Sequence, residues 1–187
     1  MLVNVATKLQ PKVFISHKRE DEVTAINIKY RLSDLGVSSF LDVVDLEKDL
    51  EPEELTNRLK SKMDECSDLL AVVSDVTEKS WWVPFEIGMA ARVNLPTVSF
   101  LKGRFVDLPG YLRIWPALPG METLKAYADQ VKLRFDKDKR GWREGRIIAD
   151  ESVDESFATY SQLRTKPSTD VFYRNLNVAL SQRNRIY

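Results

Sequence analysis

Trp82 and Glu86 have the side chains and the spacing to form part of a small-molecule site. They follow the most apolar run of the chain, residues 69–73, which predicts a buried strand. Pro84 has no N–H to donate and fits only in the first turn of a helix, so a helix should begin near residues 80–82. Positions i and i+4 share a face, which places the indole beside the carboxylate. The alternative is a core tryptophan and a first-turn glutamate favoured by the helix dipole.

The composition excludes several kinds of site. The chain has 187 residues, 43% of them hydrophobic, enough for one well-buried domain and a modest appendage. Lysine plus arginine number 28 and aspartate plus glutamate 28, so no net charge attracts nucleic acid or acidic membranes. Cys66 is the only cysteine and His17 the only histidine, so we expect no internal disulfide and no metal site. Without a leader or a membrane-length apolar stretch, the expected location is cytoplasmic.

Short β-forming runs alternate with helical patterns up to residue 135. Strands are expected at residues 12–16, 37–42, 68–74 and 96–101, with a candidate short edge strand at 114–115. Helices are expected at residues 20–35, 52–66, 82–93 and 124–135. Gly36 is expected to cap the first helix, whose core face is assigned to Val23, Ile26, Tyr30 and Leu35. The core face of the second helix is assigned to Leu55, Leu59, Met63 and Cys66.

The composition changes after Phe135. Residues 136–146 carry interleaved charges and two glycines, which predicts a solvated loop rather than a nucleic-acid patch. Helices are expected at 154–163 and 170–183, the second with one side formed by Phe172, Leu176, Ala179 and Leu180. We therefore divide the chain into a main domain, residues 1–135, and an appendage of charged loop and helices, residues 136–187.

The alternation of strands and helices predicts an α/β fold, a flavodoxin-like doubly wound sheet of five parallel strands in the order 2-1-3-4-5. Ligands bind such sheets at the carboxyl ends of the strands where the winding reverses, here between the loops after the first and third strands. The first of these loops carries Ser16, Lys18 and Arg19, and the second leads to Trp82 and Glu86. The topology thus predicts a crevice with cations on one side and an acid on the other.

The ligand class is only partly defined by these residues. The first loop lacks both glycine-rich phosphate motifs, although Lys18 and Arg19 could hold phosphate by charge; the alternative is a solvated pair. A receiver-type site fits poorly because Asp75 alone follows the third strand. Hydrolase chemistry at Ser74 fits poorly because no G-x-S-x-G elbow surrounds it.

Four segments, in order, resemble the successive boxes of a TIR domain: residues 14–21, 40–42, 66–74 and 80–86. The resemblance covers residues 12–101, and the family's W-x-x-x-E signature falls on Trp82 and Glu86. It implies the TIR fold, NAD as a substrate rather than a cofactor, and Glu86 as the catalytic acid that cleaves NAD between nicotinamide and ribose. It also implies that the substrate site is lined by Ser16, Lys18, Arg19, Asp42 and Trp82.

The chemistry is compatible with one carboxylate. Nicotinamide is a cationic leaving group that departs neutral, so no general acid is required. Glu86 could stabilise the ribose hydroxyls and the oxocarbenium-like transition state.

The resemblance also implies assembly. Residues 45–50 correspond to the BB loop, which often completes the site of a neighbouring subunit, so we expect self-association through TIR domains. This loop lacks the glycine that many members carry. A free-standing chain with a helical tail is similar to the TIR sensor subunits of the bacterial Thoeris antiviral system. Those subunits convert NAD into a cyclic ADP-ribose isomer that reaches a separate effector. Neither nucleic acid nor a membrane is an expected partner.

Three functions stay open at this point. The first is an NAD-cleaving enzyme, glycohydrolase or cyclase, in which water or a group of the substrate attacks the same intermediate. The second is a non-catalytic adaptor that acts through TIR–TIR interaction. The third is a nucleoside deoxyribosyltransferase-like enzyme, which Trp82 four residues before Glu86 disfavours.

Overall fold

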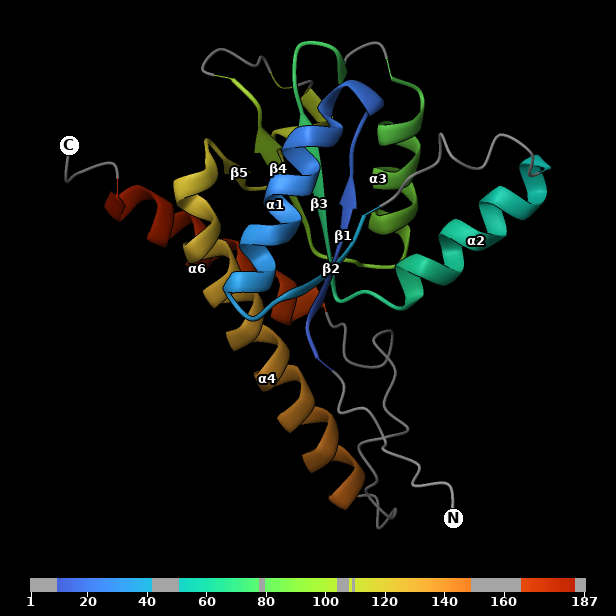
Figure 1. Cartoon of the computed structure of the whole chain (residues 1–187). Coiled ribbons are helices and arrows are strands. Elements are labelled where there is room, and N and C mark those ends of the chain that lie inside the picture. Colours follow the sequence, from blue (N-terminus) through green and yellow to red (C-terminus); the bar gives the residue numbers. More distant parts are fainter. Residues whose placement is uncertain are drawn as a thin grey trace, which may run out of the picture.

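The structure is a computed structural model that describes residues 10–41, 51–77, 80–103, 108, 110–148 and 166–183. Five strands form one sheet, and every strand pair in it is parallel. The strands are β1 (Lys12–Ser16), β2 (Ser38–Leu41), β3 (Asp68–Val73), β4 (Thr97–Leu101) and β5 (Ala117–Leu118). Their order, β2-β1-β3-β4-β5, confirms the predicted flavodoxin-like topology (Figure 1).

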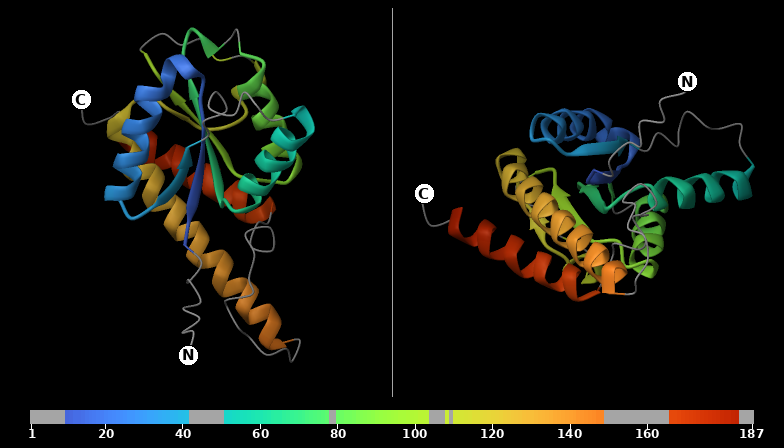
Figure 2. Two further views of the ribbon diagram at one scale, coloured as in Figure 1. Left: turned by 45° about the vertical axis from the view of Figure 1, so that its right-hand side comes forward. Right: turned by 90° about the horizontal axis from the view of Figure 1, so that it is seen from below.

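Helices cover both faces of the sheet (Figure 2). The described helices are α1 (Glu22–Asp34), α2 (Pro52–Asp64), α3 (Trp82–Arg92), α4 (Leu124–Ile148) and α6 (Lys166–Arg183). Within the described residues, short 3₁₀ turns lie at Arg19–Asp21, Gly110–Leu112 and Met121–Thr123. Helices α1, α4 and α6 pack on one face, and α2 and α3 pack on the other.

Strand β3 explains why the sheet needs both layers. All six of its residues are buried, and the five after Asp68 alternate between the two core clusters. Leu70 and Val72 pack toward α1 and α4, whereas Leu69, Ala71 and Val73 pack toward α2 and α3. A central parallel strand is covered by helices on both faces, so nearly all of its residues must be apolar.

The predicted core face of α1 is wrong. Val23 is 73% exposed and Tyr30 66% exposed, whereas the buried residues of the helix are Ala25, Ile28 and Leu32. Both sets have helical spacing, so periodicity alone could not choose between them. The direction in which the chain leaves β1 decides which stripe faces the sheet.

The predicted end of α1 at Gly36 is confirmed. Gly36 has φ of 75°, the left-handed region that favours glycine. Its N–H donates to the carbonyl oxygen of Ser33 at 2.9 Å, and the N–H of Val37 donates to that of Leu32 at 2.9 Å. These two bonds form a Schellman motif, which satisfies the last carbonyl groups of the helix.

Residues 136–146, predicted as a charged loop, instead continue α4 to Ile148. Arg134 pairs with Asp138 four residues later at 3.0 Å, so the interleaved charges support a helix in this stretch. The expected domain boundary after Phe135 thus falls inside a helix. The helix expected at 154–163 lies outside the described residues.

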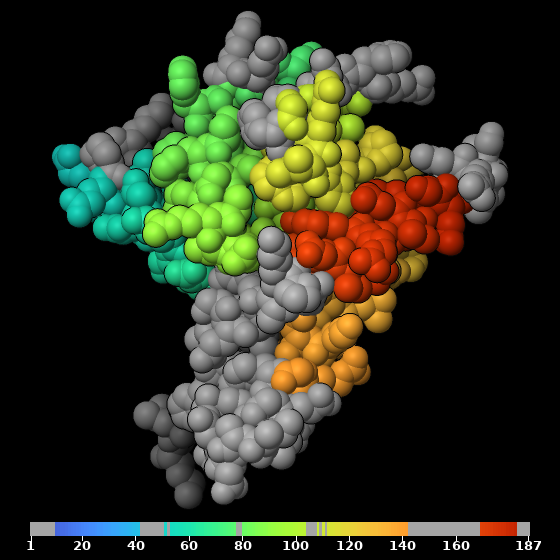
Figure 3. All heavy atoms as spheres, turned by 180° about the vertical axis from the view of Figure 1, so that it is seen from behind, coloured from blue at the N-terminus to red at the C-terminus, as the bar shows by residue number. Residues whose placement is uncertain are grey.

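The predicted edge strand at 114–115 is displaced. Ile114 is 71% exposed, and the strand that pairs with β4 is β5, three residues further along the chain. The predicted helix near the C-terminus is confirmed as α6, which inserts Phe172 and Leu176 into the core cluster that it shares with α1 and α4. Viewed from behind, α6 (red) lies on the surface between the yellow segment that contains β5 and the orange part of α4 (Figure 3).

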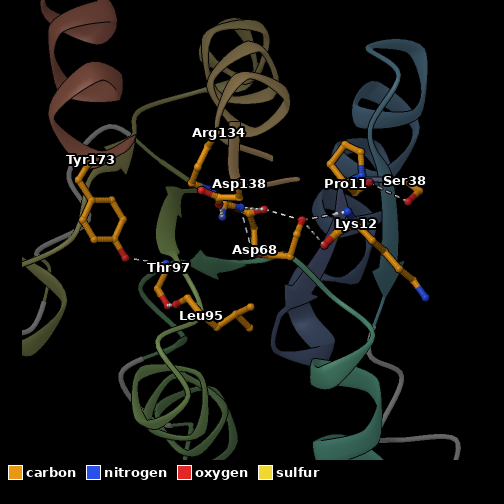
Figure 4. A network of polar contacts seen from close by, with 10 residues as sticks. Pro11, Lys12, Ser38, Asp68, Leu95, Thr97, Arg134, Asp138 and Tyr173 are labelled. Carbon is orange, nitrogen blue, oxygen red and sulfur yellow. Dashed lines mark hydrogen bonds and ion pairs between the residues drawn. The ribbon is translucent and has the colours of Figure 1, made fainter. Parts of the chain in front are cut away.

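A polar network joins α4 and α6 to the amino-terminal end of the sheet (Figure 4). The Arg134 guanidinium forms an ion pair with Asp68 at 2.7 Å and donates to the carbonyl oxygen of Ser67 at 3.1 Å. The N–H of Thr97 donates to the Tyr173 hydroxyl at 2.8 Å. These contacts fix both helices to the first residues of β3 and β4.

From the burial of the Tyr173 hydroxyl we predict that the protein loses stability at alkaline pH. Burial raises the pKa of Tyr173 to about 12, above the ordinary tyrosine value near 10. Because the folded state favours the neutral phenol, this contribution is complete below pH 10 and is lost as the pH rises towards 12. We expect Tyr173→Phe to make the free energy of unfolding less dependent on pH across this window. Denaturant unfolding at successive pH values measures it, and an unchanged slope would contradict the assignment.

Tyr127 provides a control for the effect of this substitution at neutral pH. Its hydroxyl is buried and has no hydrogen-bond partner among the described residues, and burial raises its pKa well above the ordinary value. Tyr127→Phe should therefore hold or raise stability at neutral pH, whereas Tyr173→Phe should lower it by about 1–2 kcal/mol, because Thr97 loses its acceptor.

Among the helices in the described part of the chain, none combines the length and apolar character needed to cross a membrane.

Candidate functional site

The candidate site lies at the carboxyl edge of the sheet, where β1 ends at Ser16 and β3 at Val73. The loop after β1 leads into α1, and the loop after β3 leads into α3; both lie at the same end of the molecule (Figure 1). Helix α3 begins at Trp82, with Pro84 in its first turn as the sequence predicts. The winding of the sheet reverses here, because α1 and α3 cover opposite faces.

Glu86 and Ser16 form the centre of this site. Both residues are 0% exposed, and the Ser16 hydroxyl donates a hydrogen bond to Oε2 of Glu86. Val83, Ile87 and Ala90 pack α3 onto the sheet, and Glu86 shares that inward face. A carboxylate on the core face of a helix requires a polar partner, which the last residue of β1 supplies.

Trp82 is half-buried at the first position of α3. Its ring lies 5.6 Å from that of Phe85, and it packs against the core cluster beneath α2 and α3. Trp82 therefore has a packing role, and its remaining exposure is what a stacked ligand could cover. The neighbouring Trp81 is 94% exposed.

Lys18 links the two loops. Its ammonium group donates to the carbonyl oxygen of Val76 at 3.3 Å and forms an ion pair with Glu20 at 3.1 Å. A backbone hydrogen bond, followed by the one from Lys18, holds the pKa of Glu20 below its usual value. Arg19 is exposed in the 3₁₀ turn after β1. The structure thus places the Lys18 loop against the loop after β3, whereas Asp42 lies outside the described residues.

The sequence did not identify a second polar group at this edge, formed by Asp21, Ser74 and Lys102. Asp21 is 0% exposed and accepts hydrogen bonds from the Ser74 hydroxyl at 2.6 Å and from the Lys102 ammonium group at 2.8 Å. Only the positions of these residues in the sequence could have indicated the group. They follow β1, β3 and β4, whose carboxyl ends lie at one edge of the sheet. The buried carboxylate could not be recognised among the charges of residues 18–21.

A cavity of about 360 Å³ lies at the ends of β4 and β5, lined by residues of α1, the end of β4 and residues 119–121. Its lining includes neither Ser16, Lys18 nor Glu86. This cavity is therefore separate from the Ser16–Glu86 pair. Among the described residues, no group of three or more histidine, cysteine, aspartate or glutamate side chains could hold a metal ion.

The sequence profile of the TIR domain matches residues 13–113. The match covers more than half of the chain, so the protein belongs to the TIR domain family. It spans β1 to the 3₁₀ turn after β4, with Ser16, Lys18 and Glu86 inside it, and it excludes α4 and α6.

The chain is also similar to the probable 3' cyclic ADP-D-ribose synthase ThsB' of Bacillus cereus (strain MSX-D12). The two are 27% identical over 112 residues, which is 56% of this chain and 58% of that protein. The chain thus spans less than two thirds of this relative's length. Among solved structures, a 2-desoxiribosyltransferase from Leishmania mexicana is 14% identical with a TM-score of 0.48, covering 63% of this chain and 95% of that one. A likeness this weak does not bear on function.

Proposed function

We propose that the protein cleaves NAD between nicotinamide and ribose, with Glu86 as the catalytic residue. The observation that carries the proposal is the Ser16–Glu86 pair, a carboxylate held in place where the winding of the sheet reverses. Membership of the TIR domain family supports it, since Trp82 and Glu86 carry the family's signature. The printed name of the Bacillus cereus relative, a probable cyclic ADP-ribose synthase, supports the same substrate class.

Each predicted residue has a role in this proposal. Glu86 stabilises the ribose hydroxyls and the positive charge that develops on the sugar as neutral nicotinamide leaves. Ser16 orients the carboxylate. Lys18 and Arg19 bind the diphosphate by charge, and Trp82 packs against the dinucleotide. Asp42 borders the substrate. NAD is consumed as a substrate, and no separate cofactor or metal takes part.

The biological setting belongs to the same proposal. A nicotinamide-releasing TIR protein of this kind would act in the cytoplasm, in Thoeris-type antiviral defence. Its product, ADP-ribose or a cyclic isomer, would reach a separate effector. Self-association through TIR domains would complete the site, and neither nucleic acid nor a membrane would be required.

The burial of Glu86 sets a condition on this chemistry. The side chain is 0% exposed, so its carboxylate can contact a ribose only if neighbouring groups move from their positions in this structure. An activity that depends on self-association is the expected consequence, because a partner subunit can stabilise the open arrangement.

The same burial favours a second candidate, a non-catalytic TIR adaptor. In that function Glu86 would be a structural residue held by Ser16, and the outer surfaces of the helices would bind other TIR domains. The two candidates differ in whether NAD is consumed.

Incubation of the purified full chain with NAD, at low and high protein concentration, separates the candidates. We expect nicotinamide release, measured by mass spectrometry, to rise more steeply than in proportion to protein concentration. The second product separates the two reactions, since water gives ADP-ribose and attack by a group of the substrate gives a cyclic isomer. Absence of nicotinamide at every concentration, together with self-association in sedimentation experiments, would establish the adaptor instead.

A further inference from the structure

Asp21 is the centre of a polar network that connects the carboxyl ends of three strands. One carboxylate oxygen accepts the Ser74 hydroxyl, which follows β3, at 2.6 Å. The other accepts the Lys102 ammonium group, which follows β4, at 2.8 Å. Asp21 and Ser74 are 0% and 4% exposed, so the bond between them is shielded from water. Lys102 balances the charge that Asp21 brings into the interior.

On the β3 side, the network continues to the start of α3. The backbone N–H of Ser74 donates to the Thr77 hydroxyl at 2.9 Å, and the N–H of Thr77 donates to the Ser74 carbonyl oxygen at 3.0 Å. The N–H of Ser80 donates to the Thr77 carbonyl oxygen at 2.8 Å. The Ser80 hydroxyl then accepts the N–H groups of Trp82 and Val83, each at 3.3 Å. A continuous set of hydrogen bonds thus leads from Asp21 to the first turn of the helix that carries Glu86.

On the β1 side, Asp21 fixes the loop that carries Lys18. The N–H of Asp21 donates to the carbonyl oxygen of Lys18 at 2.8 Å, which closes the 3₁₀ turn. The Lys18 side chain reaches across to the carbonyl oxygen of Val76, in the loop that Ser74 begins. The Asp21–Ser74 bond is therefore placed to set the separation between the Lys18 loop and the start of α3.

We propose that Asp21 is a positioning residue of the nucleotide site, and that its bond to Ser74 sets the affinity for the diphosphate group of the ligand. The inference rests on the proposed function and assigns different roles to two serines. Ser74, through Asp21, controls where Lys18 meets the phosphates. Ser16, through Glu86, controls turnover. Loss of the first bond should appear in KM, and loss of the second in kcat.

Ser74→Ala is the informative substitution, because it removes this bond and leaves the Asp21–Lys102 ion pair intact. Asp21→Asn would change the charge beside the phosphates and confuse the comparison. Ser67→Ala is the matched control: Ser67 is 2% exposed and donates to buried Asp68, also at 2.6 Å, at the opposite end of β3. Both variants lose one buried serine–aspartate bond. Ser67→Ala also loses the hydrogen bonds between the Ser67 hydroxyl and the backbone of Lys12, at 3.0 and 3.1 Å, so its thermal midpoint should fall at least as far as that of Ser74→Ala.

ADP binding, measured by calorimetry, and NAD turnover of the full chain and its variants test the inference. ADP carries the diphosphate and lacks the nicotinamide bond. We expect Ser74→Ala to weaken ADP binding about tenfold and to raise KM for NAD equally, with kcat changed by no more than about threefold. Ser67→Ala should bind ADP as the unmodified protein does. Ser16→Ala should lower kcat and leave ADP affinity unchanged, and Ser74→Thr, which keeps the hydroxyl, should restore most of the affinity.

The possible results separate this inference from the proposed function. Equal ADP affinities for Ser74→Ala and Ser67→Ala overturn the inference, even if NAD is cleaved. Absence of ADP binding by the unmodified protein overturns it as well. If NAD is not cleaved but ADP binding depends on Ser74 and not on Ser67, the proposed reaction fails and the positioning role of Asp21 stands.

Discussion

Glu86→Gln is expected to lower kcat for nicotinamide release by about a thousandfold, with a much smaller change in KM. Glutamine has the same size, and its amide oxygen can still accept the hydrogen bond that Ser16 donates to Glu86. The substitution therefore removes the negative charge and keeps the packing of α3. Charge is what the reaction requires, because the sugar becomes cationic as nicotinamide leaves. Nicotinamide release at saturating NAD measures the effect.

Stability gives this experiment an independent readout. A carboxylate that is 0% exposed is costly to bury, so the neutral variant should have a thermal midpoint equal to or above that of the unmodified protein. Glu65→Gln is the control, since Glu65 lies after α2 in partly exposed ion pairs with Lys12 and Lys62. Glu65→Gln should leave both kcat and the thermal midpoint nearly unchanged. Retention of more than about a third of the activity by Glu86→Gln would assign Glu86 a structural role and overturn its assignment as the catalytic residue.

Each element that was predicted correctly has a sequence that is compatible with only one local structure. Residues 69–73 form a continuous apolar run, which suits only a strand covered on both faces, and β3 is that strand. Pro84 fits only in a first helical turn, which fixed the start of α3. Gly36 has the left-handed conformation that ends α1. In each case local sterics or the need for burial leaves one local structure that fits the sequence.

The wrong predictions concern choices that tertiary contacts make. Two apolar stripes of α1 have helical spacing, and only the sheet selects Ala25, Ile28 and Leu32 over Val23 and Tyr30. Residues 136–146 contain the same charges whether they form a loop or a helix. The pairing of Arg134 with Asp138 shows that the helical reading was available from i,i+4 spacing.

The candidate site also has features that the sequence predicts and features that depend on tertiary contacts. The predicted topology places the loop that carries Lys18 and the helix that carries Glu86 at one edge of the sheet, since strand order alone determines which carboxyl ends are adjacent. The contact of Asp21 with Ser74 and Lys102 depends on how far three side chains extend from the ends of different strands. The spacing of residues along the sequence does not predict such a contact. The complete burial of Glu86 was also not predicted, because it depends on the packing around α3.

Arg134→Met is expected to lower the free energy of unfolding by about 3–5 kcal/mol, the usual cost of removing one partner of a buried ion pair. The Arg134 and Asp68 side chains are 4% and 1% exposed and lie 2.7 Å apart, so little solvent screens them. Arg134 also joins α4 to the carbonyl oxygen of Ser67 and lies 5.5 Å from the Phe172 ring of α6. Since a chain of this size loses roughly 2–4 °C per kcal/mol, the thermal midpoint should fall by about 10 °C.

Lys125→Met is the matched control on the same helix. The Lys125–Asp129 pair has the same 2.7 Å separation, but its side chains are 59% and 40% exposed, so its loss should cost less than about 1 kcal/mol.

Asp68→Asn combined with Arg134→Met tests why Arg134→Met is less stable. If the deficit of the single variant comes from the Asp68 charge without its guanidinium, the double variant should recover part of the lost stability. If the deficit comes from lost packing over Phe172, the double variant should be no more stable than Arg134→Met alone. Equal thermal midpoints for Arg134→Met and Lys125→Met would show that burial gives this ion pair no special weight.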